Sequence, residues 1–317
     1  MLPVSRPSPQ QSCGVFNKIN RKWTSLGGAP GAQVGDLIEI GDGFYIQYAN
    51  NVRIYYRPGH APFQVYGAIG DKYTQLGGPN SWLGWPASDE QPFDEGGRAS
   101  TFEHGAIYWW PDTGAIELGD IVVRYTGLAC FGETDSDQLS SSDEPYVWLS
   151  VVPILTMQSS TVRTNIYEDV DAGDSRVDNI ELYRGPPYGL SLKAVLFEHD
   201  FSDPDQYRDL IKSGVATASA GVTAAIGIIP VVGPFLAVGA GALLAGVGTE
   251  ITNAIKDVLD TQDDYIGEVS FVVTPRNMVT MARTQPKDFR GIQWDMDSPL
   301  ISGDGASYKV YIEIGAV

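Results

Sequence analysis

The chain has 317 residues, of which 43% are hydrophobic and 11% aromatic, and its formal net charge is −18. This length indicates two domains with a substantial hydrophobic core. So negative a chain excludes nucleic acid as a partner, because phosphate groups would be repelled, and it disfavours unaided binding to anionic lipid.

The N-terminal segment, residues 1–13, is rich in Pro, Ser and Gln and is expected to form a flexible lead-in. It contains no apolar stretch of the signal-peptide kind, so a leader has been removed, or the protein stays in the cell, or it leaves by another route. Cys13 and Cys130 are too few for a disulfide framework or for zinc-ligand spacing, and they form one bridge or none.

An internal repeat follows in residues 14–118. The run Ile19-x-x-x-Trp23-x-x-Leu26-Gly27-Gly28 matches Ile69-x-x-x-Tyr73-x-x-Leu76-Gly77-Gly78, and residues 54–58 match residues 107–111. Each copy is predicted to contain a short helix, a Gly-Gly stop, and a strand of alternating aromatic residues that a proline closes.

The second copy resembles the LGFP repeat, which recurs in cell-wall-associated and secreted proteins of mycolic-acid bacteria. The resemblance rests on Leu76-Gly77-Gly78, Leu83-Gly84-Trp85-Pro86 and Gly105-Ala106-Ile107-Tyr108-Trp109. The first copy departs from the pattern, with Val34-Gly35-Asp36 where leucine-glycine-x-proline is expected. The resemblance implies a secreted or cell-surface protein whose repeats bind cell-envelope polysaccharide or another glycan.

Five aromatic residues of the second copy offer flat apolar faces with polar edges, which suit sugar rings. The candidate glycan-binding residues are Trp82, Trp85, Tyr108, Trp109 and Trp110. In the alternative, alternate members of the strand at residues 107–110 point into the core, so that about half of these aromatic residues are structural.

From residue 119 onward the chain is predicted to be an antiparallel β-sandwich, because β-branched runs alternate with Gly, Asp and Pro clusters. The predicted strands are Ile121–Tyr125, Tyr146–Val152, Leu190–Glu198, Gly267–Thr274 and Tyr308–Ile314. With the helices of the repeats and the insertion described below, the expected fold class is α+β.

The acidic residues gather in the connections between these strands. Residues 133–147 resemble the first calcium loop of the C2 domain, a calcium- and phospholipid-binding β-sandwich, while residues 196–200 and 263–269 resemble the start and end of its third loop. The resemblance implies a Ca²⁺ site of carboxylates, and the alternative is ordinary solvated loop residues. The candidate metal ligands are Asp137, Asp143, Glu198, Asp200 and Asp264, and the second-choice candidates are Asp205 and Asp263.

An uncharged segment between Lys212 and Glu250 replaces that third loop. Residues 230–234, Pro-Val-Val-Gly-Pro, divide it, so we expect a helical hairpin at about 206–260 with helices at about 206–229 and 235–259. The hairpin either inserts into lipid or packs permanently on the sandwich. The candidate membrane contacts are Ile228, Ile229, Val231, Val232, Phe235 and Leu236.

The sequence carries no recognised catalytic motif, and its three histidines are scattered, so we expect a protein that is not an enzyme. The preferred hypothesis is a calcium-dependent membrane-active toxin or effector that the repeats concentrate on an envelope surface. The rival is a stable extracellular adhesin or structural envelope protein with the hairpin packed in its core. A third alternative is a hydrolase that uses an acidic pair.

Overall fold

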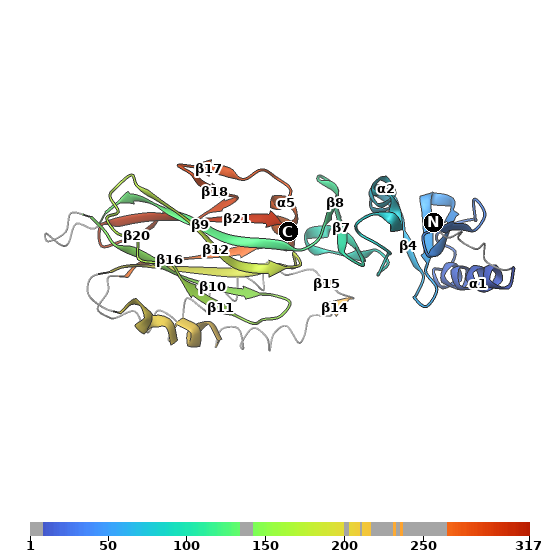
Figure 1. Ribbon diagram of the computed structural model, residues 1–317, viewed down its shortest axis with the longest axis horizontal. Helices are drawn as coiled ribbons and strands as arrows, with labels where there is room; N and C mark the ends of the chain where they lie inside the picture. The colour runs from blue at the N-terminus through green and yellow to red at the C-terminus, as the bar shows by residue number, and fades with distance from the viewer. Residues whose placement is uncertain are drawn as a thin grey trace, which may run out of the picture. The chain divides into compact units, whose positions relative to one another are not determined.

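The computed structural model describes residues 9–133, 142–199, 203–209, 211–216, 231–232, 235–236 and 265–317 (Figure 1). The chain divides into two compact units, Met1–Gly119 and Asp120–Val317, here called unit 1 and unit 2.

Unit 1 repeats one arrangement twice, a helix followed by an antiparallel sheet whose strands pair in chain order, as the repeat predicts. The helix α1 begins inside the expected lead-in. The first copy comprises α1 (Pro9–Ser25), β1 (Ile38–Ile40), β2 (Gly43–Tyr48), η1 (Ala49–Asn51), β3 (Val52–Tyr56) and β4 (Phe63–Val65). The second comprises α2 (Gly67–Leu76), η2 (Gly78–Asn80), β5 (Gln91–Pro92), η3 (Asp94–Gly96), β6 (Arg98–Phe102), β7 (Gly105–Trp110) and β8 (Gly114–Leu118).

The helices of unit 1 pack on its sheets through the apolar positions that define the repeat. Ile19 of α1 is fully buried against β2 and β3. Ile69 and Tyr73 of α2 contact the first sheet at Tyr55 and the second at Ile107, so α2 joins the two sheets in one core. The helix α2 ends at Gly77, whose φ of 111° is the left-handed conformation that a Gly-Gly stop predicts.

Unit 2 contains two antiparallel sheets that form a sandwich-like arrangement (Figure 1). One sheet has the order β11-β10-β13-β16, and the other has β12-β9-β21-β19, with β20 beside β21. All five predicted strands coincide with strands of these sheets, except that Thr274 lies beyond the end of β16 and caps α5. The bounds are β9 (Ile121–Gly132), β10 (Pro145–Pro153), β11 (Ser160–Arg163), β12 (Ser175–Gly185), β13 (Leu190–Glu198), β16 (Tyr265–Val273), α5 (Pro275–Met281), β17 (Lys287–Phe289), β18 (Ile292–Trp294), β19 (Met296–Asp297), β20 (Ile301–Gly303) and β21 (Ala306–Ala316).

The sheet that contains β13 is covered on both faces, since every residue of β13 is buried. A strand alternates its side chains between two faces, so burial along its whole length requires a layer on each side. Tyr207, which ends η4 (Pro204–Tyr207), stacks on Phe197, and the helical residues Ile211 and Val215 belong to the same buried cluster, so all three supply part of the outer layer. The start of the segment predicted as a hairpin therefore packs on the sandwich.

Most of the predicted hairpin, including Ile228 and Ile229, lies outside the described residues. In its middle, β14 (Val231–Val232) pairs antiparallel with β15 (Phe235–Leu236), so the chain reverses where the sequence predicts a turn. Phe235 and Leu236 are extended, which corrects the expected helix start at residue 235, because pairing across the two intervening residues holds both sides in strands. Within the described ranges, no helix has the length and apolar character of a membrane span.

The two cysteines are not bridged. Cys13 is exposed on α1 and Cys130 is buried in β9, and both thiols are free.

Candidate functional site

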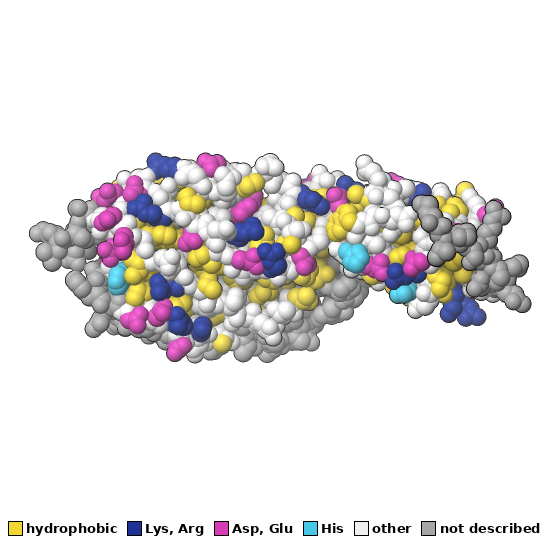
Figure 2. Space-filling view, in the orientation of Figure 1, with side chains coloured by type: hydrophobic (Ala, Val, Ile, Leu, Met, Phe, Trp, Pro, Cys, Tyr) yellow, Lys and Arg dark blue, Asp and Glu magenta, His cyan; other side chains and the backbone are white. Residues whose placement is uncertain are grey.

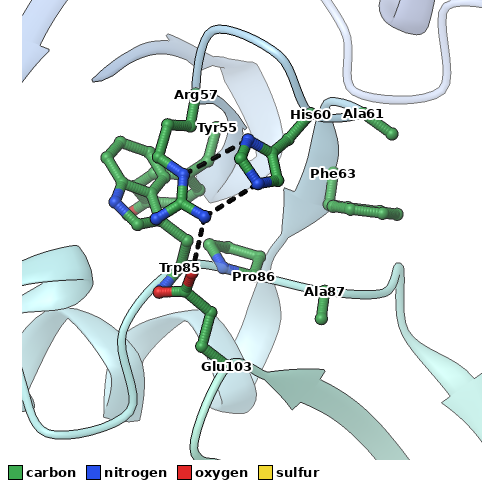
Figure 3. A pocket seen from close by; sticks show the side chains of 9 residues that line it. All are labelled: Tyr55, Arg57, His60, Ala61, Phe63, Trp85, Pro86, Ala87 and Glu103. Atoms are coloured by element: carbon green, nitrogen blue, oxygen red, sulfur yellow. Dashed lines mark hydrogen bonds and ion pairs between the residues drawn. The ribbon is translucent and has the colours of Figure 1, made fainter. Parts of the chain in front are cut away.

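A pocket of about 290 Å³ opens in unit 1 where the loop before the second sheet meets the first sheet (Figure 3). Its walls come from both copies of the repeat. The first copy contributes Tyr55, Arg57, His60, Ala61 and Phe63, and the second contributes Trp85, Pro86, Ala87 and Glu103.

A tight turn after β3 places the polar side chains of the first copy. The His60 N–H donates to the Arg57 carbonyl oxygen at 3.0 Å, and Pro58 and Gly59 occupy the central positions. Gly59 has a φ of +88°, so the turn has the proline-then-glycine pattern of type II. This turn folds His60 back over Arg57, whose Nη2 atom lies 2.9 Å from His60 Nε2.

The Leu83-Gly84-Trp85-Pro86 motif positions the second copy's contribution. Leu83 is fully buried, and Gly84 has a φ of +70°. A Cβ atom on Gly84 would lie 2.5 Å from Glu103 Oε2, so glycine is required for Glu103 to approach. The Glu103 carboxylate then accepts the Trp85 backbone N–H at 2.9 Å.

An ion pair across the two copies organises the polar side of the pocket. Arg57 Nη2 lies 2.6 Å from Glu103 Oε1, and the guanidinium lies 5.9 Å from the centre of the Trp85 ring, within cation–π range. The backbone N–H of Trp85, and after it Arg57, lowers the pKa of Glu103 from its ordinary value of 4.5. Glu103 is therefore ionised at neutral pH and balances the charge of Arg57.

Trp85 is fixed in place by contacts with the first copy. Its indole Nε1 donates to Asp42 Oδ1 at 2.9 Å, and its ring meets Tyr55 edge-on with centroids 6.5 Å apart. The side chain is only 7% exposed, and Gly43 leaves the space that its ring fills. Trp85 thus both joins the two copies and forms one wall of the pocket.

The arrangement suits a ligand with apolar faces and hydrogen-bonding edges. Phe63, Trp85 and Pro86 provide apolar surface, while Arg57, His60 and Glu103 provide donors and an acceptor on one side (Figure 3). The opposite charges of Arg57 and Glu103 cancel, which favours a neutral ligand. Sugar rings combine these two kinds of surface.

Hydrogen bonds identify the true counterpart of this loop in the first copy. Tyr73 donates to the Gly84 carbonyl oxygen at 2.7 Å, and Trp23 donates to the Gly31 carbonyl oxygen at 2.8 Å. Gly31 has a φ of +80°, close to that of Gly84. The structure therefore aligns residues 30–33 with the motif and corrects the alignment on Val34-Gly35-Asp36.

The first copy lacks counterparts of two of the pocket residues of the second copy, Trp85 and Glu103. The Ala49 N–H bonds to the Ala32 carbonyl oxygen just as the Glu103 N–H bonds to the Trp85 carbonyl oxygen, at 2.7 and 3.0 Å. Ala32 and Ala49 thus stand where the second copy has Trp85 and Glu103. The sequence alone led to the wrong alignment because Gly31 and Gly35 each offer a glycine that can be matched to the glycine of the motif.

Of the five aromatic candidates from the sequence, Trp85 is the one that lines the pocket. Tyr108 and Trp110 are 2% and 0% exposed, so neither presents a face to a ligand. Burial follows from their packing on Phe93, with ring centroids 4.9 and 5.8 Å away. Trp109 is half-buried, and Trp82 is exposed outside the pocket.

The sequence analysis missed Arg57, His60, Phe63 and Glu103. A signal was present, because Arg57 aligns with Trp110 in the repeat, so a charged residue replaces an aromatic one at matched positions. Glu103 follows the strand that pairs with the Leu83 motif, but its partner Arg57 belongs to the other copy. Only the packing of one copy on the other brings them together.

The metal candidates in unit 2 are only partly described. Asp143 is 2% exposed, and its Oδ2 atom accepts the Tyr308 hydroxyl at 2.5 Å. Glu198 Oε1 accepts the Glu144 backbone N–H at 3.4 Å, and Asp205 pairs with Arg163 at 3.1 Å. The other candidates, Asp137, Asp200, Asp263 and Asp264, lie outside the described residues.

Asp143 and Glu198 do not make a calcium cage by themselves. No group of three or more His, Cys, Asp or Glu side chains suited to a metal ion occurs among the described residues. Both candidates do lie at one end of the sandwich, where Pro145 pairs with Glu198, Phe197 with Tyr265, and Gly132 with Ser307. Figure 2 shows Asp and Glu side chains gathered at this end, near β20.

Comparison with known proteins supports the repeat. A search among curated proteins found no match to the chain. The LGFP repeat is associated with cell-envelope proteins, and residues 33–81 and 83–129 each match this repeat.

Proposed function

We propose that the two LGFP repeats bind a cell-envelope glycan in the pocket between them, and that the chain is a surface-binding protein and not an enzyme. The observation that carries this proposal is the pocket itself, in which an apolar wall at Phe63 and Trp85 faces the Arg57–Glu103 pair. The LGFP match supports the envelope as the location of the ligand.

The contacts expected of a sugar follow from this geometry. The apolar face of a ring lies on Phe63 and Pro86, and its hydroxyl groups exchange hydrogen bonds with Arg57 and Glu103. The ion pair and the contact of Arg57 with His60 hold the guanidinium in place before a ligand arrives. Preorganised groups lose little conformational entropy on binding, so the pocket favours affinity over adaptability.

Co-sedimentation of the full chain with insoluble cell-wall polysaccharide tests the proposal. Phe63→Ala and Arg57→Gln should each weaken binding about tenfold, since each removes contact or hydrogen bonding worth ~1–1.5 kcal/mol. Trp82→Ala is the matched control, because Trp82 is an aromatic residue 47% exposed outside the pocket. The control should bind like the unmodified chain.

The opposite pattern would overturn the assignment of the pocket. If Trp82→Ala lost binding while both pocket variants kept it, the glycan would bind on the exposed surface. Circular dichroism melting curves of all three variants establish that each is folded. Failure of the unmodified chain to sediment with any envelope polysaccharide would overturn the glycan function itself.

For unit 2, we propose a C2-like sandwich with the segment at about 206–260 packed on it as part of a stable envelope protein. The burial of β13 on both faces and the packing of Tyr207, Ile211 and Val215 in one buried cluster with Phe197 favour this packed state. The competing proposal is delivery of the segment to a membrane, with Ca²⁺ neutralising the acidic end of the sandwich. Membrane delivery is favoured because the chain leaves β13 after Glu198 and enters β16 at Tyr265, both at the acidic end of the sandwich.

Liposome flotation and dye release separate these two functions. The intact chain is compared, with and without millimolar calcium, with a chain in which residues 230–248 are replaced by a short Gly/Ser loop. The packed state predicts no flotation of either chain under either condition. Flotation and leakage that require both calcium and residues 230–248 would establish membrane delivery instead.

A further inference from the structure

A second pocket of about 250 Å³ lies on unit 2, away from the acidic end, on the outer face of the sheet that contains β9. It is bounded by β9, by its neighbours β12 and β21, and by β18, which contacts all three (Figure 1). Its lining is mainly polar. The residues are Arg124, Thr126, Val177, Asp178, Asn179, Gly291, Gln293 and Glu313.

The pocket lies where the hydrogen-bond ladders of three strands are interrupted together. The register of β12 against β9 shifts between Val177 and Ile180, and that of β21 against β9 shifts between Tyr311 and Ile312. Thr126 is the residue of β9 skipped by both neighbours. Bulges of this kind redirect side chains and are enriched beside functional sites.

Glycine makes this interruption compatible with the sheet. Gly127 has a φ of +145°, and a Cβ atom there would lie 2.2 Å from the Arg176 carbonyl oxygen. No other residue fits without displacing the β12 backbone. The depression is therefore specified by the sequence and is not a gap left by loose packing.

Thr126 supplies an independent indication of a ligand. It is 5% exposed, and its hydroxyl has no hydrogen-bond partner among the described residues. An unpaired buried hydroxyl costs ~1–3 kcal/mol, so its retention calls for a compensating role. Thr126 lines the pocket but its hydroxyl oxygen is covered, so a ligand that displaces the neighbouring side chains would supply the missing partner.

The groups around Thr126 are held in place by hydrogen bonds. Gln293 Nε2 donates to Asp288 Oδ2 at 2.6 Å, which orients the amide. Asp178 accepts the Tyr167 hydroxyl at 2.5 Å and the Asn179 backbone N–H at 2.7 Å. Such support is what a preformed binding site requires.

The lining selects the class of ligand. The carboxylates of Asp178 and Glu313 repel an anion, and the guanidinium of Arg124 repels a cation. Arg124 and Glu313 form an ion pair, with Arg124 Nη1 3.5 Å from Glu313 Oε2. A neutral molecule that both donates and accepts hydrogen bonds is left, and the volume is below the usual range for drug-sized ligands. Val177, 60% exposed at the rim, adds an apolar contact.

We propose that this pocket binds a single neutral sugar ring, with adjacent hydroxyl groups on the Arg124–Glu313 pair and one hydroxyl on Thr126. The site is separate from the pocket between the repeats, and it does not depend on the function proposed for that pocket. The shared chemistry admits a free monosaccharide or the terminal residue of a glycan.

NMR titration of the full chain tests this proposal with arabinose, galactose, glucose and mannose as probes. Each sugar is offered free and as its methyl glycoside, which represents a chain terminus. We expect saturable shifts of the Asn179 and Gln293 side-chain amides with at least one probe. A response to the free sugar alone identifies a monosaccharide site, and a response to the glycoside identifies a glycan end.

Thr126→Val distinguishes a ligand contact from a structural residue. The change keeps the shape and removes the hydroxyl, so affinity should fall about tenfold while the melting temperature stays level or rises. Ser298→Ala is the control, because the buried Ser298 hydroxyl accepts the Val310 N–H at 3.0 Å and does not line the pocket. This control should melt lower and bind the sugar normally.

Two results would overturn the proposal. One is the absence of saturable shifts with every sugar probe, since the intact pocket would then not recognise this class of ligand. The other is unchanged sugar affinity in Thr126→Val, which would leave its buried hydroxyl without the role assigned to it.

Discussion

The junction of the two repeats depends on Gly43, and replacing this residue tests the account of the pocket. A Cβ atom on Gly43 would lie 2.5 Å from Trp85 Cη2 and 2.6 Å from the Tyr56 carbonyl oxygen. The contact with the Tyr56 carbonyl would strain the pairing of β2 with β3, and the Trp85 ring would also have to move. Overpacking of this kind costs ~1–3 kcal/mol. Gly43→Ala should therefore destabilise unit 1 by ~2 kcal/mol and weaken glycan binding.

Hydrogen exchange measured by mass spectrometry reports this change within unit 1, although the full chain has two units that need not unfold together. Peptides from β2 and α2 should lose protection in Gly43→Ala, and polysaccharide co-sedimentation should fall. Gly35→Ala is the matched control, since its added Cβ would meet nothing within 4 Å. Equal protection and equal binding in the two variants would refute the claim that Trp85 joins the copies.

Three further predictions follow from single contacts. Because the pKa of Glu103 is lowered in the folded protein, its contribution to stability is present above about pH 4.5 and is lost as pH falls through the folded pKa. In that pH range the urea midpoint of Glu103→Gln should vary less with pH than that of the unmodified chain. Tyr308→Phe removes a donor from buried Asp143 and should lower the free energy of unfolding, measured by urea titration, by ~1–3 kcal/mol. An unchanged free energy of unfolding would contradict this prediction. Maleimide should label exposed Cys13 in the native protein and buried Cys130, whose thiol pKa burial raises, only after denaturation.

The sequence predicts those features that depend on local pattern. The apolar spacing around Ile19 and Ile69 predicts both helices, and the Gly-Gly stop predicts the left-handed end of α2. Five strands of unit 2 are predicted because β-branched runs stand between turn-forming residues, a signal that each of these strands carries by itself, whereas β12 is not predicted.

The two pockets depend on contacts that local pattern does not contain. Trp110 has the composition of a sugar-binding residue but is buried on Phe93, while Arg57 at the matched position of the first copy faces the pocket. The register shifts beside Thr126 arise from the pairing of β9 with two strands distant in sequence. Strand periodicity predicts the alternation of faces but not where pairing is interrupted.

The asymmetry of the two copies explains why a repeat is needed at all. The pocket takes Arg57 and Phe63 from one copy and Trp85 and Glu103 from the next, so a single copy supplies half of it. In the first copy, Ala32 and Ala49 replace the tryptophan and the glutamate. The first copy could therefore not complete such a pocket with a repeat placed before it. Stacked repeats contact only their neighbours, so the proposed glycan site belongs to the junction and not to the repeat. Substitutions at the junction should therefore remove binding while leaving both helix-and-sheet modules folded.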